Sequence, residues 1–238
     1  MPLLTNPGGG TGGAAYDPTL AANRAVLNRE FCRPNQWQYD WDWGQSVVSG
    51  SGAVSSTNFG VNCQTGATAG SRAQRQLGFV VSDIFLNAPN GSSTALNFSK
   101  PFTVGFAFNP VSVSTNGQFF LKLGRGADST GPLANKGFGI RLNNTTLVAQ
   151  VHDGTTLTTS ATLKTVTAAA SQITWVVLQS DGAGNVAVYI DDVLAVTMTG
   201  GPSTDDSGAF SMAAEVLNNA DASSTRIHVS PLKIATQP

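Results

Sequence analysis

One stretch, residues 173–198, constrains the fold of this chain most strongly, because it has the pattern of three consecutive β-strands joined by two tight turns. Its first part, ITWVVL, is β-branched and aromatic, a composition that suits a pleated, half-buried surface. DGAGN at residues 181–185 then supplies the glycines that a hairpin loop needs for positive φ. VAVYI at residues 186–190 alternates between two faces, and Asp191-Asp192 leads into a third apolar segment, because Asp tolerates left-handed backbone.

The same residues resemble a known family. A Trp before a strand, a D-G-x-G turn and V-x-V-Y-I-D resemble the laminin-G-like branch of the concanavalin A-like lectin/glucanase superfamily, where Asp192 would be a Gly. FTVGFAF at residues 102–108 resembles the family's F-T-V-x-F-W-F strand, with Ala107 replacing an aromatic, and TRIHVSPL at residues 225–232 resembles its closing strand. The resemblance extends over residues 102–234 and implies a two-sheet jelly roll. It implies less about function, because this fold hosts lectins, glycanases and structural modules.

Short apolar segments separated by turn residues continue along the rest of the chain. They lie at residues 77–86, 102–109, 118–123, 138–142, 146–152, 157–166, 209–217 and 225–234. About ten to twelve short strands at this spacing are typical of a sandwich or barrel. The sequence therefore predicts an all-β chain: a two-sheet antiparallel jelly-roll sandwich, concanavalin A-like, with an N-terminal Gly-rich arm and one short helix.

Three parts are predicted along the chain. Residues 1–45 form an assembly segment, residues 46–76 a Gly/Ser/Thr-rich connection with short strands, and residues 77–238 a laminin-G-like jelly-roll domain. In the first part, Asp17-Pro18 is a typical helix start. The apolar positions that follow lie roughly on one face of that helix and are candidates for an interface: Leu20, Leu27 and Phe31.

The segment WQYDWDW holds three of the four tryptophans of the chain. On a strand its aromatic side chains would share one face: Trp37, Tyr39, Trp41 and Trp43. Three interpretations stay open. This face packs against the domain's own core, forms a subunit interface, or stacks on sugar rings, since Trp and Tyr concentrate binding energy at interfaces.

Composition excludes several classes of partner. Charged residues make up 11% of the chain and the formal net charge is −1, which argues against nucleic acid and against an electrostatic membrane anchor. The N-terminus lacks the pattern of a secretory signal, and no apolar run has the length of a transmembrane helix. With synthesis expected in a host cytoplasm, free thiols are favoured for Cys32 and Cys63.

Catalytic signatures are sparse. The superfamily's hydrolases need two close carboxylates, whereas Glu30 and Glu215 are the only glutamates and lie far apart in sequence. His152 and His228 accompany no nucleophile motif and are interpreted as surface or core histidines. No enzymatic activity is therefore expected. Calcium is the one cofactor considered, since laminin-G-like domains often bind it, and the candidate loop carboxylates are Asp128, Asp153, Asp205 and Asp206, with solvated loop residues as the default.

Three functions are weighed on these observations. The sequence favours a structural protein of a virion, such as a capsid decoration, head-fibre or tail component. We expect such a protein to be a homo-oligomer, with a trimer favoured, bound to a capsid or other virion protein. The alternative is a carbohydrate-binding, lectin-like module. A glycan hydrolase or lyase is the least favoured.

Overall fold

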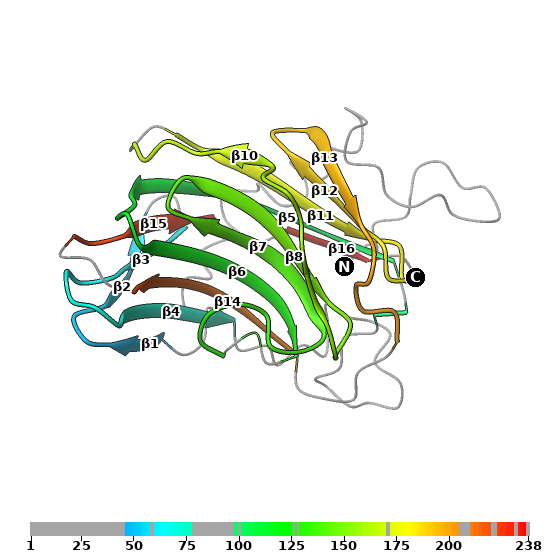
Figure 1. Ribbon diagram of the computed structural model, residues 1–238, viewed down its shortest axis with the longest axis horizontal. Helices are drawn as coiled ribbons and strands as arrows, with labels where there is room; N and C mark the ends of the chain where they lie inside the picture. The colour runs from blue at the N-terminus through cyan, green and yellow to red at the C-terminus, as the bar shows by residue number, and fades with distance from the viewer. Residues whose placement is uncertain are drawn as a thin grey trace.

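The computed structural model describes residues 46–57, 60–77, 98–99, 101–125, 127, 129–169, 172–204, 210–219, 223–230 and 233–236. In these residues the chain forms two antiparallel sheets and no helix. Sheet A runs in the order β1 (Ser46–Ser49), β4 (Ser71–Leu77), β14 (Phe210–Asn218), β6 (Gly117–Arg125), β7 (Gly137–Asn143), β8 (Thr146–His152) and β10 (Lys164–Thr165), and β9 (Leu157–Thr159) also pairs with β8. In Figure 1, sheet A lies in front, and its strands β6, β7 and β8 bend along their length.

Sheet B lies behind it (Figure 1). Its order is β13 (Val193–Met198), β12 (Val186–Ile190), β11 (Thr174–Ser180), β5 (Phe102–Ser112), β15 (Arg226–Val229), β3 (Gly60–Gln64) and β2 (Ala53–Thr57), with β16 (Lys233–Thr236) also paired to β5. The two sheets form a jelly-roll sandwich, which confirms the predicted fold class. The predicted helix and Gly-rich arm lie outside the described residues.

The segment 46–76, predicted as a connection with short strands, contributes β1 to β4, and these strands belong to both sheets. β3 pairs with β15, and β4 pairs with β14. The pattern is weak because these strands carry few apolar side chains. Among the described side chains, Ala73 of β4 and Val61 and Cys63 of β3 join the hydrophobic core.

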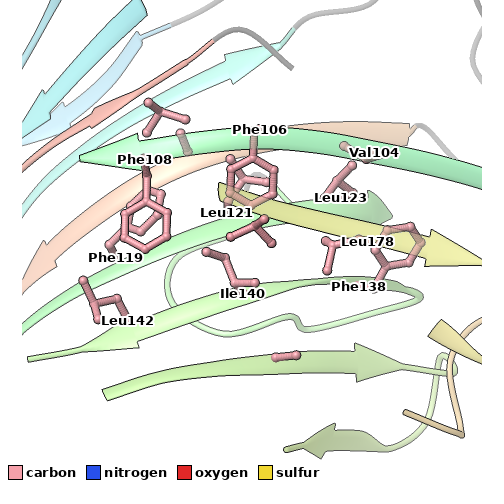
Figure 2. Packing of buried hydrophobic residues seen from close by; sticks show 14 of the residues in the cluster. Val104, Phe106, Phe108, Phe119, Leu121, Leu123, Phe138, Ile140, Leu142 and Leu178 are labelled. Atoms are coloured by element: carbon pink, nitrogen blue, oxygen red, sulfur yellow. The ribbon is translucent and has the colours of Figure 1, made fainter. Parts of the chain in front are cut away.

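The core lies between the two sheets and comes from alternate positions of facing strands. Figure 2 shows Phe106 and Phe108 of β5 pointing toward Phe119 and Leu121 of β6. The rings of Phe108 and Phe119 pack with their centroids 5.4 Å apart. Burying one large apolar side chain contributes about 1.5–3 kcal/mol, so this interlocked layer is the main source of stability.

Cys63 belongs to the same core and carries a free thiol. Burial raises its pKa to about 12, so the group stays protonated at neutral pH. Its Sγ donates to the carbonyl of Ala214 at 3.7 Å, across the sandwich. Cys63 therefore acts as a small apolar side chain, as the prediction of free thiols implies; Cys32 lies outside the described residues.

The predicted three-strand stretch forms β11, β12 and β13. The turn between β12 and β13 places Asp191 and Asp192 at φ values of 50° and 70°, in the left-handed region. The Asp191 carboxylate accepts the backbone N–H of Trp175 at 3.0 Å and pairs with Lys164 at 2.6 Å. Asp191 is therefore tied to its neighbours by its side chain, while the conformation of Asp192 is one that glycine adopts without strain.

Asp192→Gly is expected to stabilise the protein by up to about 1 kcal/mol, because the left-handed backbone costs an L-residue energy that glycine avoids. Asp192→Val should cost about 1–2 kcal/mol, since a β-branched side chain is poorly tolerated there. Chemical denaturation measures both changes. Equal stability of the Gly and Val variants would contradict this account of the turn.

Candidate functional site

The outer face of sheet A is polar, and its side chains lie in rows that cross the strands. Apolar side chains at alternate positions point into the core, so the intervening ones face outward. The strand register sets three rows, each in the order β4, β14, β6, β7, β8: Arg72, Leu217, Gln118, Asn143, Thr146; then Gln74, Glu215, Phe120, Arg141, Val148; then Gln76, Ala213, Lys122, Gly139, Gln150. Five neighbouring strands thus present one continuous surface.

A buried ion cluster lies in the middle of this face. Glu215 is fully buried, and its carboxylate accepts from Arg72 at 2.5 Å and from Lys122 at 2.9 Å. The ammonium of Lys122 also donates to the carbonyls of Ser129 and Gly131, and the Gly131 N–H donates to Glu215 at 3.1 Å. All three donors of the Lys122 ammonium are used. The cluster therefore fastens the loop between β6 and β7 to the sheet.

This loop divides the outer face into a covered half and an open half. In the covered half, Gln74, Lys122 and Glu215 are almost completely buried. The open half, which we define by Gln118, Arg141, Asn143, Thr146 and Val148, is partly exposed at every position. A ligand that binds the described part of sheet A would meet the open half.

Arg141 is the charged group of the open half. Its guanidinium lies over the ring of Phe120 at 5.8 Å, and Lys122 lies over the same ring at 5.7 Å. The Nε of Arg141 is buried and has no hydrogen-bond partner. In the next row, the Gln118 amide donates to Asn143 at 3.3 Å. The open half therefore combines one cation with amide groups at fixed positions on strands.

His152 lies at the end of β8, on the same face. Its Nδ1 accepts the Gly154 N–H at 2.9 Å, so the neutral imidazole carries its proton on Nε2 and acts as a donor. His228 lies on β15 of sheet B, where burial and the nearby charge of Arg226 lower its pKa. Because the two histidines lie on opposite sheets, they form no common site.

The outer face of sheet B has a different character. Trp175 of β11 and Leu194 of β13 are exposed on this face, with β12 between their strands. Ile173, just before β11, and Val193, at the start of β13, are also exposed. Trp175 is 40% exposed and lies opposite Ala107 of β5. This apolar surface offers ring contact, whereas the open half of sheet A offers hydrogen bonds and charge.

Most residues singled out from the sequence lie outside the described part of the chain: Leu20, Leu27, Phe31, Trp37, Tyr39, Trp41, Trp43, Asp128, Asp205 and Asp206. Of the calcium candidates, Asp153 is described, and its carboxylate accepts the backbone N–H groups of Thr155 and Thr156. These hydrogen bonds, that of Thr156 first, lower its pKa. Among the described residues, no three metal-ligating side chains come together, and calcium binding stays a prediction.

Sequence reasoning missed the cations of the outer face. Lys122 interrupts the apolar run of β6, GQFFLKLGR. This interruption is the one sequence signal that could have indicated a charged cluster on the outer face. Arg72 and Arg141 carry no comparable signal, since a single Arg in a strand is usually a solvated surface residue. Their role depends on the register of β4, β14, β6 and β7.

Comparisons with known proteins extend the fold assignment. No protein-family model and no curated protein matches the sequence. The structure is similar to an endo-β-1,4-glucuronan lyase from the fungus Trichoderma reesei, with 15% identity, a TM-score of 0.55, and coverage of 82% of this chain and 91% of the other. It is also similar to the carbohydrate-binding module CBM66 from Bacillus subtilis, with 9% identity, a TM-score of 0.47, and coverage of 80% and 94%.

A third similar structure is the binding domain of botulinum neurotoxin serotype D, with 10% identity, a TM-score of 0.50, and coverage of 81% of this chain and 43% of the other. This chain thus spans less than half the length of that domain. At these identities the likeness establishes the fold alone: a jelly-roll sandwich, as the predicted concanavalin A-like fold requires. Within the described residues, no helix is long and apolar enough to cross a membrane.

Glu215→Leu is expected to destabilise the protein by about 3–5 kcal/mol, because it leaves the buried Lys122 without its carboxylate. Denaturant unfolding measures the change. The matched control, Lys122→Met combined with Glu215→Leu, should recover much of the loss, because no unpaired buried ammonium remains. A double variant less stable than the single one would contradict the role assigned to the pair.

Proposed function

We propose that the protein is a non-catalytic carbohydrate-binding module, and that the open half of sheet A receives an oligosaccharide. One observation carries this proposal: amide, hydroxyl and guanidinium groups lie in register on neighbouring strands of a rigid sheet. The open half extends from β6 to β8, two inter-strand spacings that together measure about 10 Å. A surface of this length accommodates a short chain of sugar rings.

The chemistry of the open half suits sugar hydroxyls. Gln118 and Asn143 each offer both donors and acceptors, and Thr146 adds a hydroxyl. Their backbones are held by the β6–β7 and β7–β8 ladders, so binding requires little ordering of the chain. The fold is compatible with a saccharide ligand, since the similar glucuronan lyase is named for one.

Binding is proposed in preference to catalysis because of how Glu215 is used. Both of its oxygens accept hydrogen bonds, from Arg72 on one side and from Lys122 and Gly131 on the other. A carboxylate held in this way stabilises the loop, and because Glu215 is fully buried, a substrate on the surface does not contact it. Glu30, the second glutamate of the chain, lies outside the described residues.

The virion role favoured by the sequence rests on a jelly roll with few charges and no catalytic signature, and on the arm and aromatic segment of residues 1–45, which lie outside the described part of the chain. Neither the described residues nor the comparisons support it. The carbohydrate-binding alternative is therefore the better supported function. A virion protein that carries a carbohydrate-binding module would combine the two roles. The glycan experiment below tests the binding role independently of the virion role.

Glycan-array screening followed by calorimetry tests the proposal. Gln118→Ala combined with Asn143→Ala should weaken binding of any bound oligosaccharide at least about tenfold, because each lost hydrogen bond contributes about 0.5–1.5 kcal/mol. The melting temperature should change little, because this pair is solvent-exposed. Trp175→Ala, on the outer face of sheet B, is the control and should bind as the unmodified protein does.

Three results would contradict the proposal. Binding of no glycan would remove the function, and loss of binding in the Trp175→Ala variant alone would move the site to sheet B. Release of unsaturated or reducing sugar products by the purified protein would show that it is an enzyme and not a non-catalytic binding module.

A further inference from the structure

Arg141 differs from Arg72 and Lys122, the other described cations of the outer face, in the groups that its guanidinium contacts. Arg72 donates to Glu215 and to Gln74, and Lys122 donates to Glu215 and to two loop carbonyls. Arg141 makes a cation–π contact with Phe120, and its Nε is buried without an acceptor. Arg141 as a whole is partly exposed, so a ligand would contact the terminal amino groups of the guanidinium and not the enclosed Nε.

We propose that Arg141 is the receptor for a carboxylate of the ligand, so that the glycan bound by this face is acidic and contains uronate sugars. This inference rests on the proposed function and specifies its ligand class. A guanidinium presents a planar fork of N–H donors that matches a carboxylate in a bidentate pair. The guanidinium carbon of Arg141 lies over the Phe120 ring, 5.8 Å from its centroid, so the ring supports this cation on one side.

The charge balance of the outer face supports an anionic ligand. Its described side chains include the cations Arg72, Lys122 and Arg141 and a single carboxylate, Glu215, so three positive charges less one negative leave a net charge of +2. The whole chain, by contrast, has a formal net charge of −1. The positive charge is thus concentrated on this face, where it attracts an anion over a distance of about one Debye length.

The neighbours of Arg141 are suited to the rest of a sugar ring. In its own row Arg141 lies between Phe120 and Val148. Gln118 and Asn143 lie in the neighbouring row. A uronate ring combines one carboxylate with several hydroxyls, and these positions supply one cation and two amides. Free inorganic anions would use the cation alone.

The test compares matched ligands by isothermal titration calorimetry. The ligands are short oligosaccharides of glucuronate, galacturonate or mannuronate, each used as the free acid and as its carboxyl-reduced neutral counterpart. The unmodified protein should bind at least one acid roughly 10- to 100-fold more tightly than the neutral form, as expected for charged hydrogen bonds. Raising the salt concentration should weaken binding of the acidic oligosaccharide and leave binding of its neutral form unchanged.

Two variants of Arg141 identify the group responsible. Arg141→Met should abolish the preference for the acid and leave the weaker neutral binding in place. Arg141→Lys should recover part of the preference, because it keeps the charge and loses the planar fork. Melting temperatures confirm that both variants fold, and the comparison of acid with neutral ligand in the unmodified protein needs no variant.

Each failure has a distinct meaning. Equal binding of acid and neutral forms, or a preference that survives in Arg141→Met, overturns the role of Arg141 and leaves the carbohydrate-binding function standing. Tighter binding of a sulfated oligosaccharide that lacks uronate than of every uronate oligosaccharide shows that Arg141 receives a sulfate and not a carboxylate, and overturns this inference. Binding of no saccharide in either experiment overturns the proposed function together with this inference.

Discussion

The buried carboxylate of Glu215 determines which part of the outer face of sheet A is open to solvent. It comes from β14, whereas the ammonium of Lys122 comes from β6, and both are withdrawn from water. Two buried charges are tolerated only when they are paired and their remaining donors and acceptors are satisfied. Lys122 meets this condition by holding the Ser129 and Gly131 carbonyls. The β6–β7 loop is therefore fixed on the sheet, and the open half is the part that this loop leaves uncovered.

β6 shows how one strand serves both the core and the site. Its inward side chains, Phe119 and Leu121 among them, pack between the sheets, while Phe120 and Lys122 face outward. A shift of register by one residue would exchange the two sets, so the interlocked core of Figure 2 also fixes Phe120 beneath Arg141. The position of the ring beneath the guanidinium is thus a consequence of packing on the opposite side of the strand.

The sequence was sufficient for the local elements and insufficient for the site. The turn at Asp191 and Asp192 and the strands around it follow from neighbouring residues, and the structure has both. β4 was not predicted, because its outward positions are polar and Ala73 is the one described side chain that it contributes to the core. The ion pair of Arg72 with Glu215 joins residues 143 positions apart. No local pattern encodes such a pair, since it depends on how β4 and β14 align.

The two outer faces of the sandwich offer different chemistries, and this difference bears on the choice of ligand. On sheet A, the described side chains include no exposed aromatic ring, because Phe120 lies buried beneath its cations. Trp175, which is exposed, lies on sheet B. A neutral glycan is usually held by stacking on aromatic rings, which sheet A does not offer. Recognition there must come from hydrogen bonds and charge, and the one described charge not already neutralised by a protein carboxylate or carbonyl is that of Arg141. An acidic sugar is the ligand that such a surface discriminates best.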